Sequence, residues 1–111
     1  MSTDLFIEPN ELHLKATGSD ALIAVNNNGP NRVAIKIRCS DNGYYRIGPV
    51  YAIVEAFSVT RFIVKRLPGP AKHDFMQINC LPAGDAISSQ ARDVFQMSTN
   101  PFVVNVPLYA T

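Results

Sequence analysis

Thiol and imidazole groups are the side chains of this sequence best suited to nucleophilic or metal chemistry, and they are few. The chain has two cysteines and two histidines: Cys39, Cys80, His13 and His73. A structural zinc site needs about four such ligands at short spacings, which these positions do not show. Cys80 alternates with apolar residues, which predicts a buried, inert thiol. Cys39 ends an apolar run beside a turn, where His73 could approach it as a base. The pattern favours two reduced thiols and no metal site.

The carboxylates and glycines of the sequence also match neither a paired acid and base nor a phosphate-binding loop. The spacing of Asp74, Asp85 and Asp93 does not suggest a paired general acid and base. Residues 67–72, Leu-Pro-Gly-Pro-Ala-Lys, contain two prolines where a phosphate-binding loop needs free backbone amides. The sequence therefore predicts a binding or assembly module that has no enzymatic activity and needs no cofactor.

Basic side chains form the one charged pattern that could bind a partner. Arg32, Lys36 and Arg38 are spaced to share one face of a strand, and Arg61 and Lys65 share a face of another. A positive strip results if the two strands are neighbours. Two interpretations stay open: a solvated outer face, which we favour, and a docking surface for an acidic or phosphorylated peptide. The net charge of +1 argues against nucleic acid as a partner.

The composition predicts one folded domain over residues 1–111. Hydrophobic residues make up 47% and charged residues 17%, which suits a chain with a core and not a disordered one. No stretch approaches the roughly 18 apolar residues of a membrane span, and the N-terminus lacks the pattern of a secretory signal. We expect a cytoplasmic protein without direct membrane insertion.

Apolar and polar residues alternate in short runs along most of the chain, as in strands with one buried face. The expected inward positions are Leu12, Leu14 and Ala16; Ile23 and Val25; Val33, Ile35 and Ile37; Tyr45 and Ile47; Thr60, Phe62 and Val64; Met76, Ile78 and Cys80; and Phe102, Val104 and Val106. Turn-forming clusters separate these runs at intervals of roughly ten residues, too short for helical crossovers. The pattern predicts an all-β, immunoglobulin-like sandwich of about seven strands, with a helical turn or two near residues 87–95.

Three prolines lie inside or beside the apolar runs: Pro9, Pro49 and Pro107. Proline has no backbone N–H to donate to a ladder, so each must lie at a strand end, an edge or a kink. The sequence leaves open whether the peptide bonds before Pro9 and Pro49 are cis.

The order of these segments resembles the major sperm protein (MSP) domain. The likeness is carried by residues 35–49, where a basic strand leads through small residues and a turn to an aromatic pair and a proline. Residues 7–9, 21–27 and 55–60 fit in the same order, so the match covers nearly the whole chain. It is closest to the small, single-domain, sperm-specific members of nematodes. The resemblance implies a seven-stranded sandwich of the MSP/PapD-like type without catalytic activity.

The leading role implied by the resemblance is assembly. Nematode sperm members dimerise and polymerise into filaments that drive amoeboid movement. We therefore expect a cytoskeleton-associated homodimer in the sperm cell, with other MSP-domain proteins as further partners. Candidates for the dimer contact are open strand edges and the aromatic residues Tyr44, Tyr51, Phe75 and Tyr109, although the dimer itself is expected from the resemblance and not from these residues.

The alternative role is binding of acidic or phosphorylated peptides, as in similar domains at membrane contact sites. Those relatives end a basic strand in Lys-Thr-Thr, where this chain has Arg38, Cys39 and Ser40. Their second wall is a Lys-Phe-Met-Val strand. With Met76 and Ile78 buried, the outward positions here are Phe75 and Gln77; a shift by one residue gives Asp74 and Met76.

Neither register supplies the lysine of that second wall. Losing one charged contact costs about 1–3 kcal/mol, so we expect weak acidic-peptide binding. The candidate peptide-binding residues are Lys36, Arg38, Cys39, Ser40, Phe75 and Gln77, and the candidate basic face is Arg32, Arg61 and Lys65.

Overall fold

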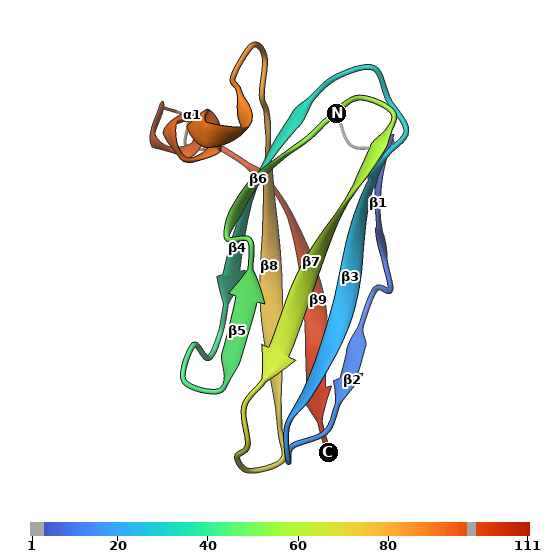
Figure 1. Cartoon of the computed structure of the whole chain (residues 1–111), viewed down its shortest axis with the longest axis vertical. Coiled ribbons are helices and arrows are strands. Elements are labelled where there is room, and N and C mark those ends of the chain that lie inside the picture. Colours follow the sequence, from blue (N-terminus) through green and yellow to red (C-terminus); the bar gives the residue numbers. More distant parts are fainter. Residues whose placement is uncertain (1–3, 98–99) are drawn as a thin grey trace.

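Two β-sheets packed face to face make up the structure (Figure 1). The computed structural model describes residues 4–97 and 100–111. The elements are β1 (Leu5–Glu8), β2 (Leu12–Leu14), β3 (Ser19–Asn27), β4 (Val33–Cys39), β5 (Tyr45–Gly48), β6 (Tyr51–Val54), β7 (Ser58–Arg66), β8 (Lys72–Pro82), the 3-10 turn η2 (Ser88–Gln90), α1 (Ala91–Met97) and β9 (Phe102–Ala110). Sheet A has the strand order β1-β3-β7-β5, and sheet B has the order β2-β9-β8-β4-β6.

The sandwich is immunoglobulin-like, as predicted, but the described residues form nine strands instead of about seven. The difference arises at two prolines. β1 pairs with β3 in sheet A, and after Pro9 the chain pairs as β2 with β9 in sheet B. Likewise β5 pairs with β7 in sheet A, and after Pro49 the chain pairs as β6 with β4 in sheet B. Both X-Pro bonds are cis, and each lies where the chain passes from one sheet to the other.

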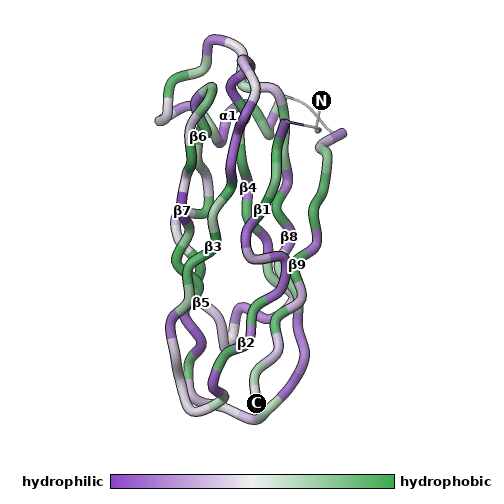
Figure 2. Tube along the Cα trace, turned by 90° about the vertical axis from the view of Figure 1, so that its right-hand side faces the viewer, coloured by the Kyte–Doolittle hydropathy of each residue, from purple (hydrophilic) through white to green (hydrophobic). Residues whose placement is uncertain are grey.

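The inward faces of the two sheets form one core, as the alternation predicts. Figure 2 shows hydrophobic and hydrophilic residues following one another along the strands of both sheets. Its buried members are Leu12, Leu14, Ile23, Val25, Val33, Ile35, Ile37, Tyr45, Val54, Phe62, Val64, Met76, Ile78, Cys80, Val106 and Leu108. Phe102 is predicted to be inward but is exposed. The short strand β2 pairs only with residues 108–110 of β9, which leaves the start of β9 as an edge of sheet B.

The helical segment lies where the sequence predicts it and packs on the outside of sheet B. α1 contacts β4 and β6, and a small cluster joins Ala91 of the helix to Ala34, Ile53 and Ala83. The helix covers one end of the outer face of sheet B. Within residues 4–97 and 100–111, neither helical segment has the length and apolar character needed to cross a bilayer.

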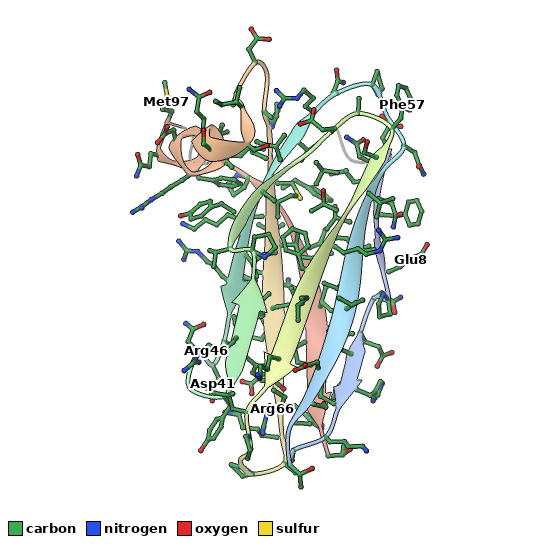
Figure 3. All side chains as sticks on the ribbon, viewed as in Figure 1. Glu8, Asp41, Arg46, Phe57, Arg66 and Met97 are labelled. Atoms are coloured by element: carbon green, nitrogen blue, oxygen red, sulfur yellow. The ribbon has the colours of Figure 1, made fainter. Side chains whose placement is uncertain are left out.

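A buried arginine holds together the end of the sandwich opposite α1 (Figure 3). Arg66, the last residue of β7, is 1% exposed. Its guanidinium donates to the backbone oxygens of Ala16 at 3.0 Å, Leu67 at 2.7 Å and Pro70. The guanidinium carbon also lies 5.0 Å from the ring centroid of Tyr44, within the range of a cation–π contact. One cation thus joins the loops that follow β2 and β7 to the segment preceding β5.

Candidate functional site

The predicted peptide-binding residues gather, with one exception, on the outer face of sheet B. β4 and β8 are neighbours, and their register places Arg38 opposite Gln77. Arg38 is exposed, while Lys36 is partly covered and lies 5.8 Å from the ring centroid of Tyr51 on β6. The outward position of Gln77 follows from the burial of its neighbour Met76, which is the first of the two registers considered above.

The hydroxyl of Ser40 lies at the end of this face and is already engaged. It accepts a hydrogen bond from the Phe75 amide at 3.0 Å and donates to the Asp74 carboxylate at 2.8 Å. Lys72, which lies 3.4 Å from Asp74, is bonded to Asp41 as well. This bond lowers the pKa of the Asp41 carboxyl and raises the pKa of Lys72. The hydroxyl and the nearby lysine are therefore committed to carboxylates of the same chain.

Cys39 is the exception, because it packs against the core instead of lining the outer face. Its thiol donates to the backbone oxygen of Asp41 at 3.8 Å, and burial raises its pKa. Burial raises the pKa of Cys80 to about 12. In the described residues His73 lies against Tyr109, with ring centroids 4.8 Å apart, and the hydrogen bonds of both thiols go to backbone oxygens. Those residues also contain no group of three potential metal ligands.

These thiols are expected to react slowly in the folded protein. At pH 8 both pKa values lie above the solution pH, so little of either cysteine is thiolate, the form that attacks a disulfide reagent. In the native protein Cys39 should be modified before Cys80, since it is the less buried, and both should react at once in denaturant. The measurement is the rate of modification by an aromatic disulfide, followed by absorbance. Rapid native modification of Cys80 would contradict its burial.

The predicted basic strip does not form. Lys36 belongs to sheet B, whereas Arg61 and Lys65 belong to β7 of sheet A, and the outer faces of the two sheets point in opposite directions. Arg32 lies just before β4, and its guanidinium donates to the Glu55 carboxylate at 2.6 Å. This contact lowers the pKa of Glu55. The alternation along each strand was predicted correctly. The strip required β4 and β7 to be neighbours, and they belong to different sheets.

The outer face of sheet A carries the exposed residues that the sequence reasoning missed. Leu22 of β3 and Ile63 of β7 lie opposite each other and are 57% and 54% exposed. Phe6 and Val59 are further exposed apolar side chains of the same sheet. The signal was present in the sequence: residues 21–25 and 62–64 are apolar without interruption, where a half-buried strand would alternate.

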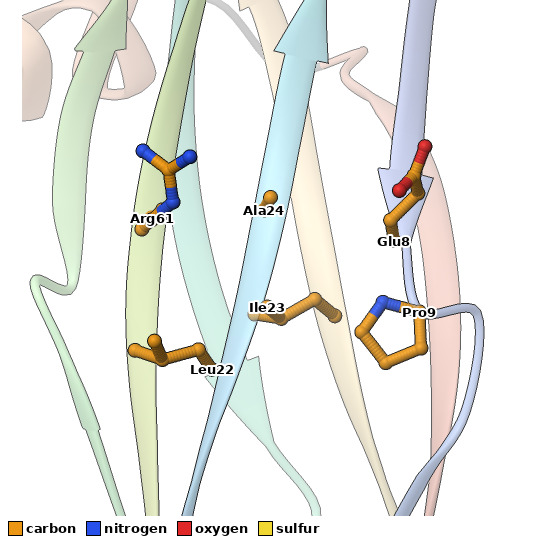
Figure 4. A pocket seen from close by; sticks show the side chains of 6 residues that line it. All are labelled: Glu8, Pro9, Leu22, Ile23, Ala24 and Arg61. Atoms are coloured by element: carbon orange, nitrogen blue, oxygen red, sulfur yellow. The ribbon is translucent and has the colours of Figure 1, made fainter.

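A hollow of about 430 Å³ opens beside this apolar pair (Figure 4). It is lined by Glu8, Pro9, Leu22, Ile23, Ala24 and Arg61. Glu8 and Arg61 lie on opposite sides of Ala24, whose methyl group leaves the space between them empty (Figure 4). The hollow therefore has an apolar floor and one side chain of each charge at its rim.

The sequence from β1 through α1 matches a known family. Residues 4–101 match the model of the MSP (Major sperm protein) domain. The chain belongs to the MSP-domain family. Domains of this family and fold typically serve as structural or interaction modules, and family members are known to assemble with one another.

Proteins of Caenorhabditis elegans are similar to this MSP domain over most of its length. Sperm-specific class P protein 10 is 31% identical over 108 residues, which are 96% of this chain and 97% of that protein. Sperm-specific class P protein 32 is 36% identical over 89 residues, 78% of this chain and 82% of that protein. Two others are matched over less of their own length: an uncharacterized protein, 37% identical over 45% of its length, and sperm-specific class P protein 34, 34% identical over 64%.

Solved structures of MSP-family proteins share the fold. SSP-19, described as an MSP-domain protein like family member of C. elegans, superposes with a TM-score of 0.89 at 28% identity, covering 96% of this chain and 99% of that one. WR4, a C. elegans MSP family member, gives a TM-score of 0.86 at 27% identity over 97% and 98% of the two chains. The periplasmic chaperone SfaE, at 11% identity and a TM-score of 0.72 over 96% of this chain and 56% of that one, shows the fold alone.

Proposed function

We propose that this MSP-domain protein is a non-enzymatic assembly module that forms homodimers in the cytoplasm of the sperm cell and acts in sperm motility or the sperm cytoskeleton. The observation that carries the proposal is its end-to-end similarity to sperm-specific class P proteins, 31% identical over 96% of this chain. The exposed apolar pair Leu22 and Ile63 supports it, because apolar side chains that gather on an outer face favour contact with another protein. The chain acts as one domain in this proposal.

Self-association is the property that tests the proposal. Light scattering coupled to size exclusion, over loading concentrations from about 1 to 200 µM, should show the average mass rising from 12.2 kDa towards twice that value. The rise follows from mass action if two copies bind each other. A mass that stays at 12.2 kDa across the whole series would contradict homodimer formation.

A second candidate function is binding of an acidic or phosphorylated peptide on the outer face of sheet B. The observation that favours it is the neighbouring placement of Arg38 and Gln77, with Lys36 on the same face of β4. The observation against it is that the Ser40 hydroxyl already donates to the Asp74 carboxylate and is engaged within the chain. We therefore rank this adaptor role below assembly.

Acidic peptides are expected to bind weakly, with a dissociation constant above roughly 10 µM at physiological salt. The physical reason is that Arg38 is the exposed cation of the face, whereas Lys36 is partly covered by Tyr51. Fluorescence anisotropy with a labelled acidic peptide measures the affinity. Arg92→Ala, on the exposed side of α1, is the matched control for Arg38→Ala. Submicromolar, salt-sensitive binding that is lost only in Arg38→Ala would favour the adaptor role instead.

A further inference from the structure

The outer face of sheet A has a pattern that is complementary to itself. We propose that this face binds the same face of a second copy of the chain, around a two-fold axis that runs parallel to β3 and β7 and passes between them. The inference rests on the proposed homodimer and specifies which surface forms it. The apolar centre of the contact is the pair Leu22 and Ile63.

Charges of opposite sign lie on the two halves of this face. Asp20 on β3 and Glu8 on β1 make one half acidic, and Arg61 and Lys65 on β7 make the other half basic. Arg46 on β5, beside Lys65, extends the basic half. All of these side chains belong to exposed residues. In the part of the chain that the structure describes, the ion pairs lie elsewhere and none joins Asp20, Glu8, Arg61 or Lys65.

The register of β3 and β7 arranges the face in rows. Asp20 lies beside Lys65, Leu22 beside Ile63, and Ala24 beside Arg61. A two-fold axis between the strands and parallel to them places each residue of β3 opposite its row partner in the second copy. Asp20 then meets Lys65 of the second copy, and Leu22 meets Ile63 of the second copy. Each of these contacts occurs twice, because the interface is isologous.

The alternative two-fold axis, perpendicular to the strands, is disfavoured by charge. That axis would place β3 on β3 and β7 on β7, so the basic half of one copy would face the basic half of the other. Like charges in an interface cost several kcal/mol. The pattern of charges therefore selects the axis parallel to the strands. Both axes keep the strands of the two facing sheets aligned, as in other packed sheets, so charge alone decides between them.

The hollow beside the apolar pair gives the second copy a side chain to accept. In the proposed arrangement Arg61 of the second copy lies opposite Ala24, the residue that leaves the hollow open. A guanidinium entering there would reach Glu8 at the rim (Figure 4). A bidentate contact between Arg and a carboxylate is among the stronger ionic hydrogen bonds. The hollow beside Ala24 is therefore suited to accept Arg61 from the basic half of the second copy.

The area of the outer face of sheet A indicates how tightly two copies should bind each other. Sheet A has four strands, and its longest strands have nine residues. With strands about 4.8 Å apart and about 3.3 Å per residue, the face measures roughly 19 by 30 Å. Two copies would bury about 1,100 Å², at the lower end of specific interfaces. We therefore expect a reversible dimer with a dissociation constant on the order of micromolar.

Charge reversal in two separate variants tests the contact between copies. In Asp20→Lys both copies carry cations at the paired positions, and in Lys65→Asp both carry anions, so each variant alone should associate at least about tenfold more weakly. In an equimolar mixture the introduced lysine of one variant meets the introduced aspartate of the other. Sedimentation velocity should then show association close to that of the unaltered protein. Arg38→Asp, on sheet B, controls for the change in net charge of Lys65→Asp.

The outcomes separate this inference from the proposed function. Weak association of each variant, restored in the mixture and unaffected by Arg38→Asp, supports the interface on sheet A. If the unaltered protein dimerises and both variants dimerise as well as it does, the face is wrong while the homodimer stands. Loss of association without recovery in the mixture overturns the proposed axis. An unaltered protein that is monomeric at all concentrations overturns both.

Discussion

Replacing Arg66 with alanine is expected to lower the free energy of unfolding by about 3–5 kcal/mol. Arg66 is 1% exposed, and its guanidinium donates to the backbone oxygens of Ala16, Leu67 and Pro70. Without it, the oxygens of Leu67 and Pro70 lose this donor, the Ala16 oxygen keeps only the Gly69 amide, and the space beside Tyr44 is left empty. The free energy is obtained from urea denaturation followed by circular dichroism. Since a small domain is stable by about 5–15 kcal/mol, the variant should lose much of its stability.

Arg66→Lys tests whether the site needs the planar guanidinium, with its several donors, or only a positive charge. Lysine presents one ammonium group on a flexible stem and cannot reach three separated acceptors with the planar geometry of arginine. We expect Arg66→Lys to recover less than half of the loss. Arg92→Ala, an exposed arginine of α1, should change stability by less than about 0.5 kcal/mol. An Arg66→Ala variant as stable as Arg92→Ala would show that the loops at this end hold together without the guanidinium.

Replacing Phe62 with alanine should have a similarly large effect, about 3–5 kcal/mol. Phe62 lies on the inward face of β7 and is 0% exposed. Removing the ring loses the free energy that the protein gains by burying it away from water. It also leaves a cavity between the two sheets. The same urea titration measures the change.

Phe75→Ala is the matched control, because it removes the same ring from a position that is 45% exposed on the outer side of β8. It should cost about 1 kcal/mol, well below the loss for Phe62, since nearly half of the area of Phe75 is already in water. Equal losses for the two variants would mean that the assignment of inner and outer faces is wrong.

The outer face of sheet B was largely predictable, because its residues depend on alternation within single strands. Met76 and Ile78 are inward, so Phe75 and Gln77 are outward, and Arg38 follows by the same reasoning on β4. Cys39 is the residue of this set that lies off the outer face. It belongs to the inward row of β4, which the same alternation would have indicated.

The face of sheet A shows the limit of such reasoning. Leu22 and Ile63 interrupt the alternation of their strands, which is a local signal that both sides of each strand are apolar. Only the register of β3 and β7 shows that the two side chains are neighbours and that Asp20 lies beside Lys65. A pattern of charges suited to a second copy cannot be read from two strands whose pairing is unknown.

The sequence by itself determined the fold class, the inward residues of most strands, the turns between them and the MSP-domain family. These features depend on side-chain period, turn chemistry and the order of segments, all of which are local along the chain. The tertiary structure alone decided that the chain changes sheets at Pro9 and Pro49, that Arg61 and Lys65 lie on the sheet opposite Lys36, and that Leu22 meets Ile63. The physical reason is that strand pairing joins residues far apart in the chain, and the hydrogen bonds and burial that select one pairing exist only once both sheets have formed.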